Sequence, residues 1–401
     1  MPSRIHFQWS AQDAAASSGR SGNAAATFRC ARSMEYAPFC SSHFSTGVSL
    51  HSHTLHSKET LSFLYRAARH WRPLQAAIRR GERRHREVHG SELDLARAWW
   101  TPPLGPHQAW RLEASQIEAL DLHPLVSLTD HDNIEAPVSL QVLEECNGSP
   151  ISVEWTVPFQ NTFFHLGVHN LPPAAARAFF QEMDAFRRDP RERRLGEILG
   201  ALAEAPGVLI VFNHPLWDEL GIGQQAHRAA AAEFLARFGS FLHALELNGM
   251  RTWRENRAVI DFAEAVAKPT ISGGDRHLVE PNALLNVTHA RSFDEFVEEI
   301  RAGFSDVLIL RHYREPYALR ILHNVLDALK NYEDHANGWT QWSDRVFYQF
   351  EDGRVRSLSG LFEAGLPTPV AVFVALARFA STPHFRRLLR SAVFGLEEIQ
   401  L

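Results

Sequence analysis

The sequence predicts an α/β protein in which short buried strands alternate with amphipathic helices. The clearest evidence is the stretch 195–303, where short apolar runs are separated by segments whose apolar residues recur at helical spacing. A second observation is that histidines and acidic residues directly follow several apolar runs. This order is typical of parallel strands with outer helices, and both a closed barrel and an open doubly wound sheet fit it. In either fold, chemistry takes place at the carboxyl ends of the strands.

The elements of this stretch can be assigned in order. A first helix is indicated by apolar residues at helical spacing, namely Leu195, Ile198, Leu199 and Leu202. Strands are expected over the apolar runs at 208–212, 244–247 and 270–272. Helices are expected between these strands, at about 225–238 and 259–266. Ser292 and Glu295 form a capping box that begins a last helix, and Gly303 ends it.

Two terminal regions differ from this pattern. Alanine and serine fill 18 of the positions 1–47, which show no apolar periodicity, so this segment is expected to be a disordered or poorly ordered tail. Residues 306–401 mix helix-like and strand-like segments, with a hairpin expected at 346–355 that turns at Asp352 and Gly353. We interpret them as a C-terminal α+β subdomain. The main domain would then cover 48–305.

A basic insertion lies at 60–122, after the first strand of that domain. Eight arginines against two glutamates give a formal charge of +6 within 65–90. The simpler interpretation is a solvated helical insertion. The functional one is a basic lid or an arm that attracts anions near the active site.

Composition narrows the classes of function. The 41 lysines and arginines against 46 acidic residues give a net charge of −5, which offers no overall reason to expect nucleic acid. No apolar stretch approaches the roughly 18 residues of a membrane span, so no membrane partner is expected. The three cysteines are too few for a disulfide framework, and a cytoplasmic location is the default expectation. The 22 histidines are the unusual feature.

The histidines and carboxylates recur at the ends of separate apolar runs or within them. These residues are His51, His53, Asp130, His131, Glu154, His165, His214, Asp275 and His277. Residues two apart on a strand point to the same side, so the two imidazoles of a His-x-His pair can bind the same metal ion. One such pair is a weak signal, but its repetition predicts a metal site with both nitrogen and oxygen ligands. Such a site suits Zn, Mn, Fe or Co, and a carboxylate can bridge two ions.

At these residues the chain closely resembles the PHP superfamily (polymerase and histidinol phosphatase). The matching motifs occur in the family's order over about 48–290. They are His-Ser-His-Thr at 51–54, Thr-Asp-His-Asp-Asn at 129–133, Glu154, His-Leu-Gly at 165–167, His-Pro at 214–215 and Gly-Asp-Arg-His at 274–277.

The resemblance implies a distorted (β/α)7 barrel, a site for two or three divalent ions (Zn, Mn or Fe) and hydrolysis of phosphate esters. The ligands that it implies are His51, His53, His131, Glu154, His165, His214, Asp275 and His277. Many members carry a metal-binding Asp where this chain has Lys58. Other members place a ligand one residue later, so Glu59 is the expected ninth ligand and His56 a weaker candidate.

The leading expectation is a phosphatase acting on a small phosphomonoester. A hydroxide shared by two metal ions would attack phosphorus, because bound metal lowers the pKa of water toward neutrality. Asp275 could bridge the ions or orient the hydroxide, and Asp130 could orient an imidazole through its second nitrogen. Candidate phosphate-binding residues are Arg251, Arg254 and Arg276, because a guanidinium matches two phosphate oxygens.

Two other functions remain as alternatives. A nuclease or phosphodiesterase acting on nucleotides or oligonucleotides would be favoured if the arginines of 65–90 lined the groove, and it would show salt-sensitive binding to single strands. A non-catalytic protein, with the metal site kept for folding or partner binding, is the third. The tryptophans at 155, 217 and 253 could stack on a base, although packing explains them more simply. The sequence leaves the oligomeric state open.

Overall fold

The computed structural model describes residues 3–8, 35–39, 41–70, 72–280, 282–362, 368–380, 382 and 385. Strands and helices alternate through most of this part, which confirms the α/β class. All the elements expected over 195–303 are present. Their helices form because one face is apolar and buried: Leu195, Ile198, Leu199 and Leu202 all point into the core. The hydroxyl of Ser292 caps the last helix by accepting from the amide of Glu295.

A six-stranded sheet carries the first ligand motifs. Its order is β2-β1-β13-β12-β3-β6, with β12 antiparallel to both neighbours and the other pairs parallel. The strands are β1 (Arg4–Phe7), β2 (Glu35–Pro38), β3 (Thr46–Ser49), β6 (His123–Val126), β12 (Leu284–Thr288) and β13 (Asp306–Ile309).

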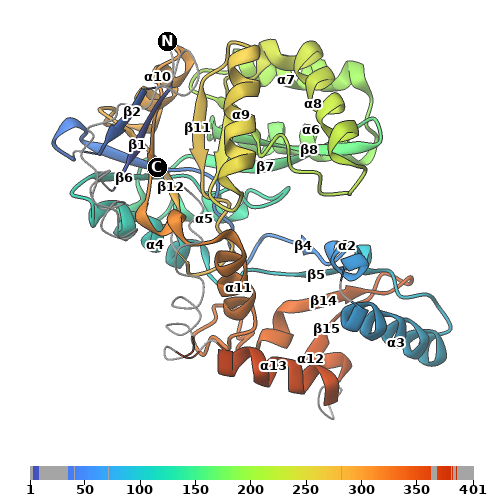
Figure 1. The fold of residues 1–401 in the computed structure, drawn as a ribbon. Helices are drawn as coiled ribbons and strands as arrows, with labels where there is room; N and C mark the ends of the chain where they lie inside the picture. Colours follow the sequence, from blue (N-terminus) through green and yellow to red (C-terminus); the bar gives the residue numbers. More distant parts are fainter. Residues whose placement is uncertain are drawn as a thin grey trace.

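A five-stranded sheet of order β11-β10-β9-β8-β7 carries the other motifs. Its strands are β7 (Ile151–Phe159), β8 (Thr162–Leu171), β9 (Leu209–Asn213), β10 (Ala244–Asn248) and β11 (Thr270–Gly273). Outer helices pack around the two sheets, as Figure 1 shows. They are α4 (Pro106–Glu118), α5 (Glu135–Leu140), α6 (Ala176–Arg188), α7 (Glu192–Glu204), α8 (Gln224–Phe238), α9 (Trp253–Ala265) and α10 (Phe293–Arg301).

The two sheets approach each other at the ligand motifs. Val48 of β3 packs in one buried cluster with Val211 of β9, Ile271 of β11 and the apolar face of α10. Isolated β-bridges pair Ser52 with Arg276 and His131 with Glu154, so each bridge joins the edge of one sheet to the other. The distorted (β/α)7 barrel that the resemblance implies stays a prediction, because the described strands of this region pair as two separate sheets.

A third sheet combines the insertion with the C-terminal region, which the sequence did not indicate. Its order is β15-β14-β5-β4, and all its pairs are antiparallel. We call it the insertion sheet; its strands are β4 (Glu59–Thr60), β5 (Ala98–Trp100), β14 (Val346–Gln349) and β15 (Val355–Ser357). It confirms the hairpin expected at 346–355, and Gly353 takes the left-handed backbone (φ 83°) that this turn requires.

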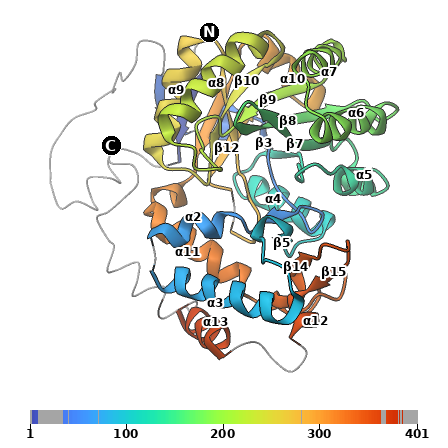
Figure 2. The same ribbon diagram turned by 90° about the vertical axis from the view of Figure 1, so that its right-hand side faces the viewer.

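Five helices accompany the insertion sheet at one end of the molecule, as Figure 2 shows. They are α2 (Phe63–His70), α3 (Arg72–His89), α11 (Tyr317–Ala328), α12 (Leu358–Leu361) and α13 (Thr368–Ala380). The helical character expected for 65–90 therefore has its counterpart in α2 and α3. No helix within the described ranges is both long enough and apolar enough to cross a membrane.

The expected tail at 1–47 is wrong for its described residues. Strand β1 pairs in parallel with both β2 and β13, and its Ile5 and Phe7 are buried in the main core. A four-residue strand within an Ala- and Ser-rich segment is too short to create visible periodicity, and its partner β13 lies about 300 residues away. Residues 9–34, on which the same expectation falls, lie outside the described part of the chain.

Candidate metal centre

The structure brings all nine predicted ligands together. Each sits at or just beyond the end of a strand, or within β7 or β8, and comes from one of six places in the sequence. Their side-chain donors form four overlapping groups in which all atoms lie within 4.8 Å of one another. The groups are His53, Glu59, His131 and His277; His51, Glu154 and His214; His51, His53 and Asp275; and His131, Glu154 and His165.

Glu154 is the centre of this cluster. Its Oε2 lies 3.0 Å from Nε2 of His51, 3.4 Å from Nε2 of His53 and 3.1 Å from Nδ1 of His131. Its Oε1 lies 3.4 Å from Nδ1 of His165 and 3.2 Å from Nε2 of His214. One fully buried carboxylate therefore faces five imidazoles, and both of its oxygens have several neighbours.

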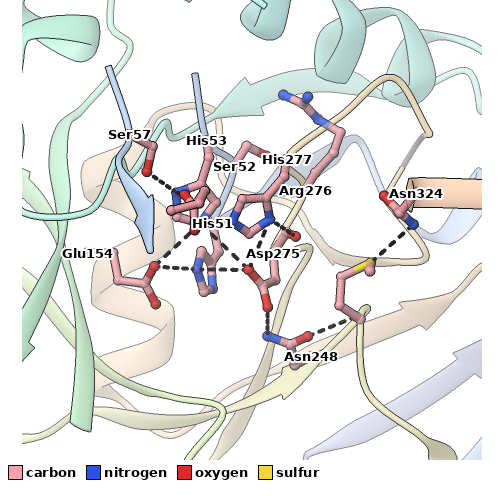
Figure 3. A network of polar contacts seen from close by, with 12 residues as sticks. His51, Ser52, His53, Ser57, Glu154, Asn248, Asp275, Arg276, His277 and Asn324 are labelled. Carbon is pink, nitrogen blue, oxygen red and sulfur yellow. Dashed lines mark hydrogen bonds and ion pairs between the residues drawn. The ribbon is translucent and has the colours of Figure 1, made fainter. Parts of the chain in front are cut away.

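Two further carboxylates complete the cluster. Oδ1 of Asp275 lies 3.7 Å from His51, 3.6 Å from His53 and 3.6 Å from His277, as Figure 3 shows in part. Oε2 of Glu59 lies 3.2 Å from Nε2 of His277 and 3.4 Å from Nε2 of His131. The cluster is most open here, since the side chains of His277, His131 and Glu59 are 20%, 17% and 13% exposed.

Three ligands have backbone that residues other than glycine rarely adopt. The φ angles of His51, His214 and Asp275 are 64°, 28° and 52°. Such conformations cost roughly 1–3 kcal/mol each and persist where the surroundings hold them. Here they occur at the turns that leave β3, β9 and β11, where the chain directs a side chain into the cluster. Three residues with this unusual backbone therefore supply side chains to one cluster.

Four ligand atoms in the described cluster are buried and have no hydrogen-bond partner: Nε2 of His51, Nε2 of His53, Oε1 of Glu59 and Oε2 of Glu154. Leaving a buried polar group unsatisfied costs about 1–3 kcal/mol. Divalent cations among these atoms would satisfy them, and imidazole with carboxylate is a donor set that Zn, Mn and Fe accept. The residues present therefore fit a metal site, and the overlapping groups fit more than one ion.

The pKa values in the cluster follow from burial and mutual charge. Burial, with neighbouring imidazoles such as His277, lowers the pKa of His53 to about 3, so this ligand is neutral. Burial alone would raise the pKa of Glu154, but His51 and His131 outweigh it and hold the pKa well below the usual range. Burial likewise lowers the pKa of His51, but Glu154 and two further carboxylates outweigh it and raise the pKa well above the ordinary value. A metal ion must displace the proton that His51 then holds.

Glu246 is a buried supporting residue that the sequence analysis missed. Its Oε1 lies 2.5 Å from Nδ1 of His51, and its Oε2 accepts from the amide of His214 at 2.8 Å. Gly273 on β11 makes room for it, because a Cβ there would overlap the Glu246 carboxylate. In the sequence, Glu246 was only the polar residue of an apolar run, and a charged residue inside a strand with buried neighbours was the one available signal.

We expect Glu246→Gln to weaken metal binding by about 10- to 100-fold, the effect usual for residues that orient a metal-binding histidine. The amide cannot offer His51 the same charged acceptor, so the ring loses both orientation and basicity. Equilibrium dialysis against a competing chelator would measure this, with the exposed Glu204→Gln as the control. Equal affinities for the two variants would contradict the role assigned to Glu246.

Two further predicted site residues, Asp130 and Arg276, make other contacts than expected. The carboxylate of Asp130 accepts from the amide (2.5 Å) and the hydroxyl (2.7 Å) of Thr54 and so fixes the loop after His53. Within the described residues, no hydrogen bond joins this carboxylate to an imidazole. Burial raises the pKa of Asp130 to about 7. Arg276 points away from the cluster and pairs with Glu113 of α4, as Figure 3 shows for its direction.

The other two candidate phosphate-binding arginines, Arg251 and Arg254, differ in their surroundings. Nη2 of Arg251 lies 3.4 Å from Oδ2 of Asp275, and its guanidinium stacks 3.7 Å from the centre of the Trp217 ring. Arg254 is exposed on α9, and no contact joins it to the cluster within the described residues. Of the other tryptophans considered, Trp155 is buried and Trp253 packs against Phe7, which supports the packing interpretation for both.

Of the neighbouring residues Lys58 and Glu59, Glu59 is the one that lies in the ligand cluster, as the resemblance implied. Lys58 stacks over the ring of Trp99, 5.1 Å from its centre, while Glu59 joins the cluster. His56 belongs to none of the four ligand groups among the described residues.

Comparison with known proteins gives distant similarities. No family model and no curated protein matches the chain. Among solved structures, an amidohydrolase from Chromobacterium violaceum with bound sulfate and no metal is 17% identical, with a TM-score of 0.32 over 45% of this chain and 84% of its own. PsfC from Pseudomonas syringae is 15% identical, with a TM-score of 0.35 over 50% and 83%. A proposed metal-dependent phosphoesterase from Bifidobacterium adolescentis is 14% identical, with a TM-score of 0.30 over 45% and 85%.

Proposed function

We propose that this protein is a metal-dependent hydrolase of the phosphomonoester of a small molecule. The observation that carries the proposal is the cluster of nine histidine and carboxylate side chains with Glu154 at its centre. Four buried ligand atoms of this cluster have no hydrogen-bond partner among the described residues. Two or three ions held there would supply Lewis acidity and a water of lowered pKa. Zn, Mn and Fe all suit such donors, and the shared use of His51, His53, His131 and Glu154 favours more than one ion.

The chain's own residues would act on the phosphate as follows. Arg251 is only 12% exposed and borders Asp275, so its guanidinium can hold a phosphate oxygen beside the ligands. Trp217 keeps that guanidinium in place by stacking on it. The more exposed ligands His277, His131 and Glu59 mark the side from which substrate can enter.

The proposal is tested by metal analysis together with a phosphoester screen. We expect purified protein to contain divalent metal and to hydrolyse at least one phosphomonoester. A chelator should remove this activity, and added metal should restore it. His53→Ala should lose both metal and activity. Equal metal content and activity in the two proteins would contradict the proposal, and hydrolysis of oligonucleotides alone would favour the nuclease alternative. Metal binding without any hydrolysis would favour a non-catalytic role.

We further expect Arg251→Met to lower kcat/KM for the best phosphomonoester by about 10- to 100-fold, since one charge-assisted contact contributes roughly 1.5–3 kcal/mol. Metal content should stay unchanged, because Arg251 donates to a ligand but is not one. Arg254→Met is the matched control and should behave like the wild type. If the two variants had the same kcat/KM, Arg251 would have no role in holding phosphate.

A further inference from the structure

The insertion sheet contributes more to the site than the ligand Glu59. Strands β4 and β5 are antiparallel, with Glu59 directly opposite Trp100 and Thr60 opposite Trp99. Residues directly opposite each other in such a pair project from the same face of the sheet. Trp100 therefore shares the face of Glu59, which is turned toward the metal ligands.

Contacts on both faces agree with this register. The Trp100 ring lies 6.1 Å from the ring of His277, centre to centre. The neighbouring Trp99 faces the other way, where it packs against Lys58 and Phe347. Two adjacent tryptophans on one strand thus have different surroundings, and only Trp100 borders the cluster.

Trp100 stands beside the open side of the cluster. His277, which it adjoins, is the most exposed of the nine ligands, and the Trp100 side chain is itself only partly buried. Arg251, proposed above to hold phosphate, approaches Asp275 through Oδ2, whereas His277 approaches it through Oδ1. Arg251 and the histidine beside Trp100 therefore contact different oxygens of the same carboxylate.

We propose that Trp100 is a specificity-determining residue and that the substrate is a phosphate ester whose organic part carries a flat ring. With its phosphate at the metal ligands and Arg251, such a substrate places its ring against the indole. The contact removes apolar surface of both partners from water and aligns two π systems. This inference rests on the proposed function, since it assumes that the phosphate occupies the metal centre.

The test compares two ligands that resist hydrolysis, phenylphosphonate and methylphosphonate, bound to the metal-loaded full-length protein in a calorimeter. We expect the wild type to bind phenylphosphonate about tenfold more tightly, because stacking of one ring on an aromatic side chain is worth about 1–3 kcal/mol. Trp100→Leu should reduce this preference to less than twofold, and Trp100→Phe should keep part of it. Trp99→Leu, on the opposite face of the same strand, is the matched control and should keep all of it.

The outcomes separate the two proposals. Equal affinity of the wild type for both phosphonates would overturn the role of Trp100, even if Trp100→Leu failed to fold. A preference that Trp99→Leu and Trp100→Leu lose alike would also overturn it, because the effect would then come from the strand as a whole. If neither phosphonate binds and no phosphomonoester is hydrolysed, the proposed function fails as well. Hydrolysis of a phosphomonoester without any preference for a ring would leave the proposed function intact and remove only this inference.

Discussion

Replacing Glu154 by alanine is expected to abolish metal binding and metal-dependent activity. Its two oxygens approach five imidazoles within 3.0–3.4 Å, so they take part in two of the four ligand groups. Residues that merely orient ligands change metal affinity by about 10- to 100-fold, so the loss of a central ligand should exceed about 100-fold. Elemental analysis and the rate on the best phosphomonoester would measure the two effects.

Two further variants make this prediction specific. Glu154→Gln keeps the shape of the side chain but removes its charge, and it should lose metal almost as completely, because a neutral amide is a weak ligand. Glu145→Ala removes a half-exposed carboxylate that pairs with His107 and should leave metal content unchanged. Full metal occupancy in Glu154→Ala would show that the cluster around Glu154 is not the metal site.

Glu113→Ala should destabilise the fold more than any surface substitution. Glu113 is 1% exposed and pairs with Arg276, which is 3% exposed. Its carboxylate also accepts from Ser49 (2.7 Å), Ser52 (3.1 Å) and Asn282 (2.6 Å). Removing one partner of a buried ion pair leaves the other charge uncompensated and typically costs about 3–5 kcal/mol. Denaturant unfolding of the metal-free protein would measure this loss.

A double-mutant cycle shows whether the unpaired charge of Arg276 causes the loss of stability in Glu113→Ala. Glu113→Ala should cost less in an Arg276→Met background, because no buried charge is then left unpaired. The exposed pair Arg193 and Glu197 is the control, and Glu197→Ala should change the unfolding free energy by about 0.5 kcal/mol or less. An equal cost of Glu113→Ala in both backgrounds would show that the charge of Arg276 is not what Glu113 compensates.

Eight of the nine ligands follow apolar runs or lie within them, whereas Glu59 was expected only from the resemblance to the PHP superfamily. A strand is visible as an apolar run, and its period of two decides which neighbours share a side. The pairs His51 with His53 and Asp275 with His277 were recognisable in this way. The hairpin at 346–355 was visible for a similar reason, since its turn residues lie within the segment itself.

The supporting residues depend on contacts between distant segments. Glu113 meets Arg276 across 163 positions, and Glu246 meets His51 across 195. Each is an ordinary residue of a helix or a strand until the fold places it beside a ligand. The different surroundings of Trp99 and Trp100 likewise depend on the register between β4 and β5, and no local pattern specifies register between strands that are about 40 residues apart.

The insertion sheet has a consequence for the order in which the protein can mature in the cell. Strand β5 is held between β4 and β14, and an isolated pair of strands has little stability of its own in water. During synthesis, the histidines that surround Glu154 are made well before β14, which ends at Gln349. Until β14 is present, β4 and β5 cannot hold Glu59 firmly in place. The nascent chain cannot assemble its complete ligand set before β14 has left the ribosome, so the site becomes complete only after the residues up to Gln349 have been made.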